Sequence, residues 1–415
     1  MEKTAKGRKS HNCIMCGSDE LSLVLDLGHQ PHSDYFLRQD ELDDVEFFFP
    51  LRLVSCQKCG LLQIDYFVDP EYLYQGEYLY QSSTTQTGKL HYHQMAKEIV
   101  DEFGFNKDDL AIDIGSNVGV LLEGFKKSGM KVLGVDPARV AEKANEKGIE
   151  TIIDFFNSET AQLIKDKYGK AKVISGTNVF AHLHDLDDAI KGAKILLDEN
   201  GVITIEAPSA LDLLEHLEYD TIYHQHICYL SVKPMKTFFE KHGLELFQVK
   251  HSSIHGGTLR YYVGHKGKHE VNGSIKDYLK KENDFGVYDN LRLEKFSSDV
   301  RKQKVDLIRL LLSLKERGKT IIALSAPAKG NTLLNYCNID KTILDFATEK
   351  NPLKIGRFTP GVHIPIYDDE TILKLKPDYA LILAWNFSKE IMENMKEFRE
   401  GGGKFIIPIP TPEII

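Results

Sequence analysis

The sequence lacks a surplus of positive charge, a long apolar run and an apolar leader. Its 52 lysines and arginines are outnumbered by 61 aspartates and glutamates, which gives a formal net charge of −9. Because binding to a phosphate backbone depends on clustered cations, this balance argues against a nucleic-acid partner. No stretch approaches the roughly 20 consecutive apolar residues that span a bilayer, and residues 1–12 are polar and basic. We therefore expect no membrane partner, no signal peptide and a cytoplasmic location.

The composition also excludes a disordered or fibrous chain. Of 415 residues, 42% are hydrophobic and 27% are charged, close to the values of ordinary globular proteins. At roughly 150 residues per domain, this length predicts two to three domains. The sequence has no short internal repeat and no low-complexity tract, and we expect a monomer by default.

Cysteine is scarce: six residues in a chain of this length do not make a disulfide scaffold. Four of them form two CxxC pairs, Cys13 with Cys16 and Cys56 with Cys59. Each pair places two thiolates on one tight turn, and two turns complete a tetrahedral sulfur set for zinc. Four sulfur ligands leave no open position, so this zinc is expected to hold a fold together and not to activate water. Reduced thiols without metal, or a redox site, are the alternatives.

Strands and helices alternate along much of the remaining chain. This alternation is typical of a parallel, doubly wound α/β sheet. We expect three units: a zinc-binding module at 1–85, a Rossmann-like domain at 86–285 and a smaller C-terminal α/β domain at 286–415. In the second unit, strands are predicted at 110–114, 131–135, 151–153, 171–175 and 201–206, with helices between them at 119–128, 139–147, 158–168 and 186–197. In the third unit, strands are predicted at 320–324, 343–347, 380–383 and 404–407, with a helix from Thr332.

The turn after the first of these strands carries a glycine loop, Asp113-Ile-Gly115-Ser-Asn117-Val-Gly119. Gly115 permits a tight turn with a close backbone approach, and Gly119 opens the following helix. The second strand ends in Asp136, about twenty residues further on, where an acid commonly accepts hydrogen bonds from ribose hydroxyls. The spacing differs from the G-x-G-x-x-G of a dinucleotide-binding fold, which is the alternative.

The loop and its following acid resemble those of class I S-adenosylmethionine-dependent methyltransferases. The resemblance implies that Asp113 lies near the methionine end of the methyl donor and that Asp136 binds the ribose diol. Residues after the third and fourth strands would border the adenine and the transferred methyl group. The implied cofactor site is made of Asp113, Gly115, Asn117, Gly119, Asp136, Pro137, Asp154, Phe155 and Asn178.

Two histidine clusters also follow predicted strands: His182-Leu-His184 after the fourth, and Tyr223-His-Gln-His226 after the fifth. Ligands of open α/β sheets bind beyond the carboxyl ends of the strands, so both clusters are expected beside the methyl donor. A neutral imidazole can take up a proton at working pH. A second metal site built from four histidines is the alternative, although no carboxylate at ligand spacing accompanies them.

The CxxC pairs, the glycine loop and the Tyr-His-x-His run together resemble the bacterial sugar C-methyltransferases over nearly the whole chain. Segments 325–336 and 354–361 resemble that family's C-terminal signatures. The family acts on nucleotide-linked 4-keto-deoxyhexoses. The resemblance therefore implies S-adenosylmethionine and structural zinc as cofactors and a nucleotide-sugar as substrate. It implies that His226 abstracts the proton beside the ketone and that the resulting enolate carbon is methylated.

The same resemblance assigns the other catalytic positions. Tyr223, His182 and Tyr80 match family positions at the active site, and Tyr223 or His182 would hydrogen-bond the developing oxyanion. Gln225 departs from the family, which usually has glutamate before the base. A carboxylate there would stabilise the imidazolium and raise its basicity, whereas an amide can only orient it.

The nucleotide end of the substrate needs anion donors. Lys329 and Asn331 open a helix after a strand, where backbone N–H groups and the helix dipole favour a phosphate. We expect Lys329, Asn331 and Asn335 to bind the diphosphate or nucleotide, with Arg357 as a further cation and His255 facing the sugar. Exposed cations usually only solvate a surface, and the glycines beside His255 serve equally well in a β-bulge.

Two other functions fit the sequence. Gln225 leaves open an O- or N-methyltransferase on the same scaffold, whose acceptor needs no acidic C–H bond. It also leaves open a zinc protein that binds a nucleotide or S-adenosylmethionine without catalysis.

Overall fold

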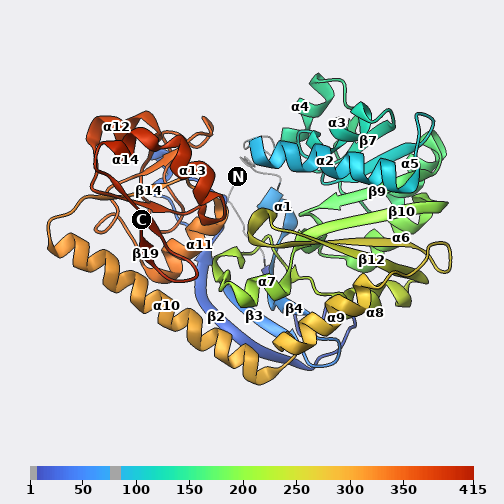
Figure 1. Ribbon diagram of the computed structural model, residues 1–415, viewed down its shortest axis with the longest axis horizontal. Helices are drawn as coiled ribbons and strands as arrows, with labels where there is room; N and C mark the ends of the chain where they lie inside the picture. Colours follow the sequence, from blue (N-terminus) through green and yellow to red (C-terminus); the bar gives the residue numbers. More distant parts are fainter. Residues whose placement is uncertain (1–6, 75–85) are drawn as a thin grey trace.

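The computed structural model describes residues 7–74 and 86–415, so the predicted site residue Tyr80 lies outside the described residues. Figure 1 shows two α/β bodies side by side, one cyan through green to yellow and one orange to red, with the blue N-terminal strands reaching between them. Within the described part of the chain, no helix is both long and apolar enough to cross a membrane.

The N-terminal module is built on an antiparallel sheet of β2 (Leu21–Pro31), β3 (Phe48–Cys56) and β4 (Leu62–Ile64). Its fourth strand, β11 (Cys228–Tyr229), comes from much later in the chain and pairs with β4. The module is completed by β1 (Gly7–Lys9), η1 (Gln39–Glu41), β5 (Tyr66–Val68) and α1 (Pro70–Tyr74).

The central domain holds a seven-stranded sheet in the order β12-β13-β10-β9-β6-β7-β8, in which β13 runs antiparallel to its neighbours β12 and β10. The parallel strands confirm the predicted doubly wound arrangement. The strands are β6 (Leu110–Ile114), β7 (Lys131–Val135), β8 (Thr151–Ile152), β9 (Ala171–Thr177), β10 (Leu197–Pro208), β12 (Leu244–Ser252) and β13 (Thr258–His265).

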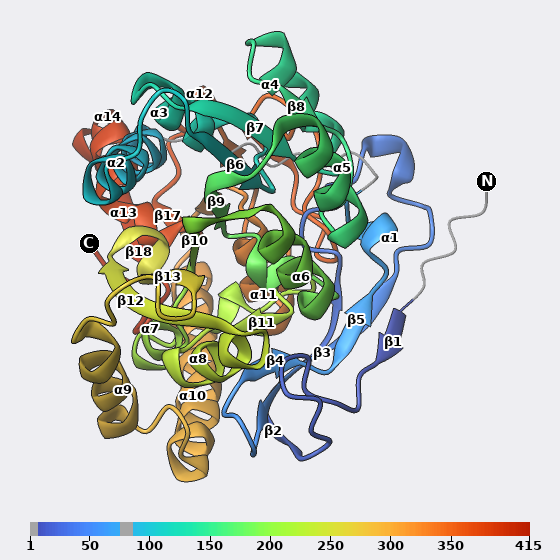
Figure 2. The same cartoon turned by 90° about the vertical axis from the view of Figure 1, so that its right-hand side faces the viewer.

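Helices cover both faces of this sheet (Figure 2), because alternate strand residues point to opposite sides. Ala111 and Val173 pack with α2 and α3, whereas Ile112 and Ile174 pack with α5, α6 and α8. The helical elements are α2 (Gln86–Phe103), α3 (Val120–Lys127), η2 (Arg139–Ala141), α4 (Glu142–Glu146), α5 (Ser158–Tyr168), η3 (Phe180–His182), α6 (Leu186–Leu196), α7 (Ala210–Glu215), η4 (Tyr219–Thr221), α8 (Val232–Lys241) and η5 (Ile254–Gly256).

Two charged helices, α9 (Ser274–Phe285) and α10 (Asn290–Glu316), lead to the C-terminal domain. There the sheet order is β16-β15-β14-β17-β18-β19, parallel except for β19. Its elements are β14 (Ile321–Leu324), α11 (Ala328–Cys337), β15 (Ala347–Glu349), β16 (Ile366–Asp368), α12 (Glu370–Leu375), β17 (Tyr379–Ile382), η6 (Trp385–Phe387), α13 (Ser388–Asn394), α14 (Lys396–Glu400), β18 (Lys404–Ile407) and β19 (Glu413–Ile414).

Two predicted elements of this domain are displaced. The helix expected from Thr332 begins at Ala328, directly after Pro327, whose extended backbone ends the preceding loop. The strand expected at 343–347 starts only at Ala347. The reason is a turn, because the Asp340 carboxylate accepts the Thr342 N–H and the Asp340 carbonyl accepts the Ile343 N–H.

Apolar clusters join the three units. Leu53 of β3 belongs to the same buried cluster as Tyr219 of η4 and Leu307 of α10. Met15, between the first two predicted zinc ligands, is buried in one cluster with Phe238 of α8. The N-terminal module therefore packs against both α/β domains.

Candidate functional site: a sulfur cage and a methyl-donor cleft

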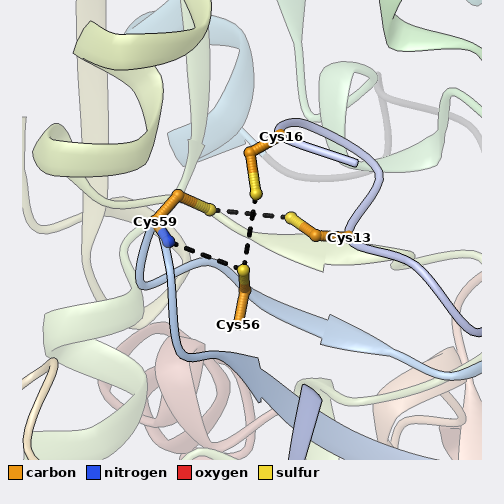
Figure 3. A group of neighbouring side chains, drawn as sticks. All are labelled: Cys13, Cys16, Cys56 and Cys59. Carbon is orange, nitrogen blue, oxygen red and sulfur yellow. Dashed lines mark hydrogen bonds between the residues drawn. The ribbon is translucent and has the colours of Figure 1, made fainter. Parts of the chain in front are cut away.

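The four cysteines of the CxxC pairs converge on one point (Figure 3). Cys13 Sγ lies 3.6 Å from Cys59 Sγ, and Cys16 Sγ lies 3.5 Å from Cys56 Sγ. All four sulfurs lie within 4.8 Å of one another. Four sulfurs that each bind zinc at about 2.3 Å in a tetrahedron are about 3.8 Å apart. This donor set fits a structural zinc ion, whose four coordination positions would all be taken by cysteine sulfurs, with none left for a substrate.

Neighbouring groups prepare this cage for a metal. A hydrogen bond from the Cys59 thiol lowers the pKa of Cys13, which favours the thiolate form that binds a metal. Gln63 of β4 accepts the Ile14 N–H at 3.0 Å and holds the first turn against the sheet. No disulfide competes for these thiols, because all six cysteines, each within the described residues, are free.

The glycine loop has the geometry expected of a methyl-donor site. Asp113, 2% exposed at the end of β6, accepts the Ser175 hydroxyl at 2.8 Å, and burial raises its pKa to about 7. Gly115 adopts a φ of +68°, and a Cβ there would lie 2.6 Å from Val179 Cγ2. The loop backbone therefore approaches the end of β9 more closely than a side chain would allow.

Asp136 connects the loop to the end of β7. Its two carboxylate oxygens accept the backbone N–H groups of Asn117 and Ala138, each at 2.8 Å. Asn117 has a φ of +50° and Gly119 a φ of +79°, so both lie in the left-handed region that this turn needs. Burial raises the pKa of Asp136. The acid predicted to bind a ribose diol is thus held in one orientation, with Pro137 half-buried beside it.

Asn178 presents a buried hydrogen-bond acceptor at this edge of the sheet. Its backbone has a φ of +54°, and its N–H donates to the Glu206 carbonyl at 2.7 Å. The side-chain Nδ2 donates to the Tyr92 hydroxyl of α2 at 3.3 Å, but Oδ1 is buried without a partner among the described residues. An orphaned buried acceptor of this kind fits the ammonium group of a bound amino-acid moiety.

The two residues expected beside the adenine differ in exposure. Asp154 is exposed, and its carboxylate accepts the N–H of the following Phe155 at 2.8 Å. Phe155 is half-buried, so its ring can border a planar ligand. Both lie after β8, next to the strand that carries Asp136.

The two ring nitrogens of His226 make different hydrogen bonds. Its Nδ1 lies 2.8 Å from the Thr221 carbonyl, which can only accept, so Nδ1 carries the ring proton. The Nε2 lone pair then accepts the Tyr223 hydroxyl at 2.7 Å. The base and the tyrosine predicted from the sequence therefore form a hydrogen-bonded pair, with ring centroids 4.0 Å apart.

His182 lies beside this pair, with its ring centroid 5.0 Å from that of His226. Its Nδ1 is 3.3 Å from the Tyr74 hydroxyl, and its Nε2 is buried without a partner among the described residues. Burial lowers the pKa of His182 well below its ordinary value, so the ring is neutral. Sequence reasoning missed Tyr74, although the tyrosine-rich stretch from residue 72 was a signal.

Gln225 points elsewhere. Its Oε1 accepts the Ser33 hydroxyl at 3.1 Å, and its Nε2 donates to His32 Nε2 at 2.8 Å. All three residues are buried, and burial lowers the pKa of His32 to about 3. The structure does not bring the Gln225 amide to the His226 ring, contrary to the expectation that it orients the base. It ties the histidine run to the N-terminal module, and no sequence spacing points to this contact.

The C-terminal candidates have structural partners. Asn331 Nδ2 donates to the Ser33 carbonyl at 2.7 Å, leaving Oδ1 buried and unpartnered among the described residues. Asn335 Nδ2 donates to the carbonyls of Asn331 and Pro360. Arg357 reaches the Phe36 carbonyl at 3.3 Å. Asn331 and Arg357 thus help to join the C-terminal domain to the N-terminal module, whereas Asn335 makes its hydrogen bonds within the C-terminal domain.

Lys329 lies at the start of α11, as predicted. Its Nζ donates to Asn386 Oδ1 and lies 3.9 Å from the centroid of the Trp385 ring. Burial lowers its pKa. The last predicted substrate residue, His255, is in η5, and its side chain lies outside what the structure describes.

Comparisons with known proteins find matches over nearly the whole chain. Family models match residues 13–74 as a zinc binding domain, 89–249 as a methyltransferase domain and 253–410 as a C-methyltransferase C-terminal domain. The C-methyltransferase NovU of Streptomyces niveus is 33% identical over 410 residues, which cover 98% of this chain and 97% of NovU.

Solved structures resemble part of the chain. An S-adenosylmethionine-dependent methyltransferase from Clostridium acetobutylicum is 12% identical with a TM-score of 0.35, covering 45% of this chain and 94% of that protein. The magnesium protoporphyrin IX methyltransferase of Synechocystis is 14% identical with a TM-score of 0.34, covering 45% and 87%. The family assignment rests on the sequence matches: this chain belongs to the bacterial sugar C-methyltransferases and is a zinc-binding, S-adenosylmethionine-dependent C-methyltransferase.

Proposed function

We propose that the protein methylates a carbon next to the ketone of a nucleotide-linked 4-keto-deoxysugar, with His226 as the base. The observation that carries this proposal is the His226 ring, whose Nδ1–H is committed to the Thr221 carbonyl. This bond leaves Nε2 as the nitrogen that can accept a proton. A proton on a carbon beside a ketone is only weakly acidic, so its removal needs a base on one face and a donor at the oxygen.

Two donors would be available to the developing oxyanion. The Tyr223 hydroxyl, now on His226 Nε2, would turn to the ketone oxygen and so free the Nε2 lone pair. If the Tyr74 hydroxyl donates to His182 Nδ1, the neutral ring of His182 carries its proton on Nε2, the buried atom that lacks a partner among the described residues. That N–H would be the second donor. Tyr80 is a further candidate that the described residues do not include.

When bound, S-adenosylmethionine supplies an electrophilic methyl group on sulfur. Asp136 would accept hydrogen bonds from the ribose diol, and Asn178 Oδ1 would accept one from the ammonium group. Asp113, Gly115, Asn117 and Gly119 shape the loop around it. The protein's contribution to the transfer step is placement, because a carbanion and a sulfonium methyl group in line need little further acid–base help.

The nucleotide end would lie against the C-terminal domain. Lys329 is the cation best placed for a diphosphate, because the α11 N-terminus adds backbone N–H groups to its charge. Asn331 Oδ1, buried and unpartnered among the described residues, would accept a donor from the ligand. Asn335, His255 and Arg357 complete the proposed substrate side.

Incubation with methyl-labelled donor and a panel of thymidine- and uridine-diphosphate 4-keto-6-deoxyhexoses tests the proposal. We expect a new C–CH₃ group by NMR and, without methyl transfer, exchange of the adjacent C–H with solvent deuterium. His226→Ala should lower both rates by about 10²–10⁴-fold, the usual contribution of a general base. His265→Ala is the matched control, because β13 runs antiparallel to β10 and His265 therefore lies at the sheet edge opposite the carboxyl ends of the parallel strands. Label found on oxygen or nitrogen, or in no product, would refute the proposed reaction.

A further inference from the structure

Three successive residues of η4 have different tasks. The first, Tyr219, is fully buried, and its hydroxyl donates to Gln303 Oε1 of α10 at 2.7 Å. Gln303 Nε2 in turn donates to the Pro408 carbonyl near the C-terminus at 2.6 Å. Tyr219 is therefore anchored on the C-terminal domain, although η4 belongs to the loop that precedes the histidine run.

The second residue, Asp220, is bound by the same domain. Its Oδ2 accepts the Trp385 indole N–H at 2.7 Å, and the Lys329 ammonium lies 3.9 Å from the Trp385 ring centroid. Asp220 is fully buried, and its Oδ1 has no hydrogen-bond partner among the described residues. A buried carboxylate with a single donor is costly, so this contact is maintained against a desolvation penalty.

The third residue, Thr221, holds the base. Its carbonyl accepts the His226 Nδ1–H at 2.8 Å, and that bond decides which imidazole nitrogen carries the ring proton. Thr221, which carries this carbonyl, directly follows Asp220 in the chain. Any shift of η4 toward or away from the C-terminal domain therefore turns the carbonyl that orients the ring.

We propose that Tyr219 and Asp220 are positioning residues, through which Gln303 and Trp385 of the C-terminal half set the orientation of His226. The inference rests on the proposed role of His226 as the base. It gives the C-terminal domain a part in proton abstraction besides binding the nucleotide end of the substrate. Misplacement of a reacting group by about 1 Å can cost about 10²-fold in rate, even from a distant change.

The test separates proton abstraction from methyl transfer. Deuterium exchange into a 4-keto nucleotide-sugar is followed with S-adenosylhomocysteine bound, so that no methylation occurs. Trp385→Phe keeps an aromatic ring and removes the N–H donor, and we expect exchange to slow by about 10- to 100-fold. The dissociation constant of S-adenosylhomocysteine should stay unchanged, because η4 is not part of the donor loop.

Further variants distinguish positioning from folding. Asp220→Asn keeps an oxygen acceptor for the indole and should retain near-wild-type exchange, whereas Asp220→Ala should match Trp385→Phe. The double variant Asp220→Ala with Trp385→Phe should be no slower than either single variant, because both break one bond. Tyr219→Phe, which breaks the bond to Gln303, should also slow exchange. Tyr367→Phe, a half-exposed tyrosine elsewhere in the same domain, is the matched control.

The outcomes are distinguishable. If the wild-type protein exchanges the proton and Trp385→Phe, Asp220→Ala and Tyr219→Phe all exchange it equally fast, the positioning role is overturned and His226 remains the base. A wild-type protein that exchanges no proton in any keto-sugar would overturn the proposed function itself, and with it this inference. Slowing that Asp220→Asn shares fully with Asp220→Ala would also count against the proposal, since the retained acceptor should rescue the rate.

Discussion

Gly115→Ala tests the close packing of the methyl-donor loop. The change adds a Cβ at a φ of +68°, 2.6 Å from Val179 Cγ2 and 2.9 Å from Val179 Cβ. The left-handed backbone costs a non-glycine residue about 1–2 kcal/mol, and forced overpacking typically costs about 1–3 kcal/mol more. The free energy of unfolding should therefore fall by about 2–5 kcal/mol. Urea unfolding of the apo protein measures this loss.

Gly104→Ala is the matched control, because Gly104 has nearly the same φ, +67°, with nothing within 4 Å of the added Cβ. It should cost only the backbone part, about 1–2 kcal/mol. Adding Val179→Ala to Gly115→Ala should recover part of the lost stability, because it removes the clash with Val179 Cγ2. The recovery should be only partial, because the contact with Val179 Cβ remains. Adding Val179→Ala to Gly104→Ala should recover nothing. Binding of S-adenosylhomocysteine, measured by calorimetry, should weaken in Gly115→Ala alone.

Equal losses in Gly115→Ala and Gly104→Ala would refute the packing argument. Strict additivity of Gly115→Ala and Val179→Ala would do the same, because residues in contact couple in a double-mutant cycle. In either case, the left-handed backbone conformation alone would explain why glycine occupies position 115.

Three further outcomes follow from other parts of the molecule. Cys56→Ser, or prolonged chelation, should lower the zinc content that elemental analysis measures and lower the melting temperature, because the cage joins two turns of a small module; an unchanged zinc content would contradict the site. Burial raises the pKa of Asp220 from 3.8 to about 6. The stability that the protonated carboxyl gives the folded protein is therefore complete below pH 4 and is lost as the pH rises through 6. Asp220→Asn should therefore gain stability relative to the wild type over that interval, by about 3 kcal/mol at most, in denaturant titrations at both ends; a difference independent of pH would exclude a raised pKa. Gln225→Leu should destabilise the protein by about 1–3 kcal/mol, because Ser33 and His32 lose their buried partner; unchanged urea unfolding would show that these hydrogen bonds contribute nothing net.

Local chemistry explains what the sequence predicted well. The strands at 110–114 and 131–135 and the helix at 158–168 match the structure to the residue. Short apolar runs and caps mark such elements, as where Asn157 accepts the Thr160 N–H at a helix start. The strand expected at 343–347 was displaced because a turn anchored on Asp340 competes with it.

The sequence by itself determined the two CxxC turns, the donor loop and the histidine run, because each is a motif of residues close together in the chain. Only the tertiary structure decided what those groups contact. Gln225 meets His32 across 193 positions, and Asp220 meets Trp385 across 165. Partners so distant come together only when separately encoded surfaces dock, and no local spacing records which buried donor will meet which acceptor.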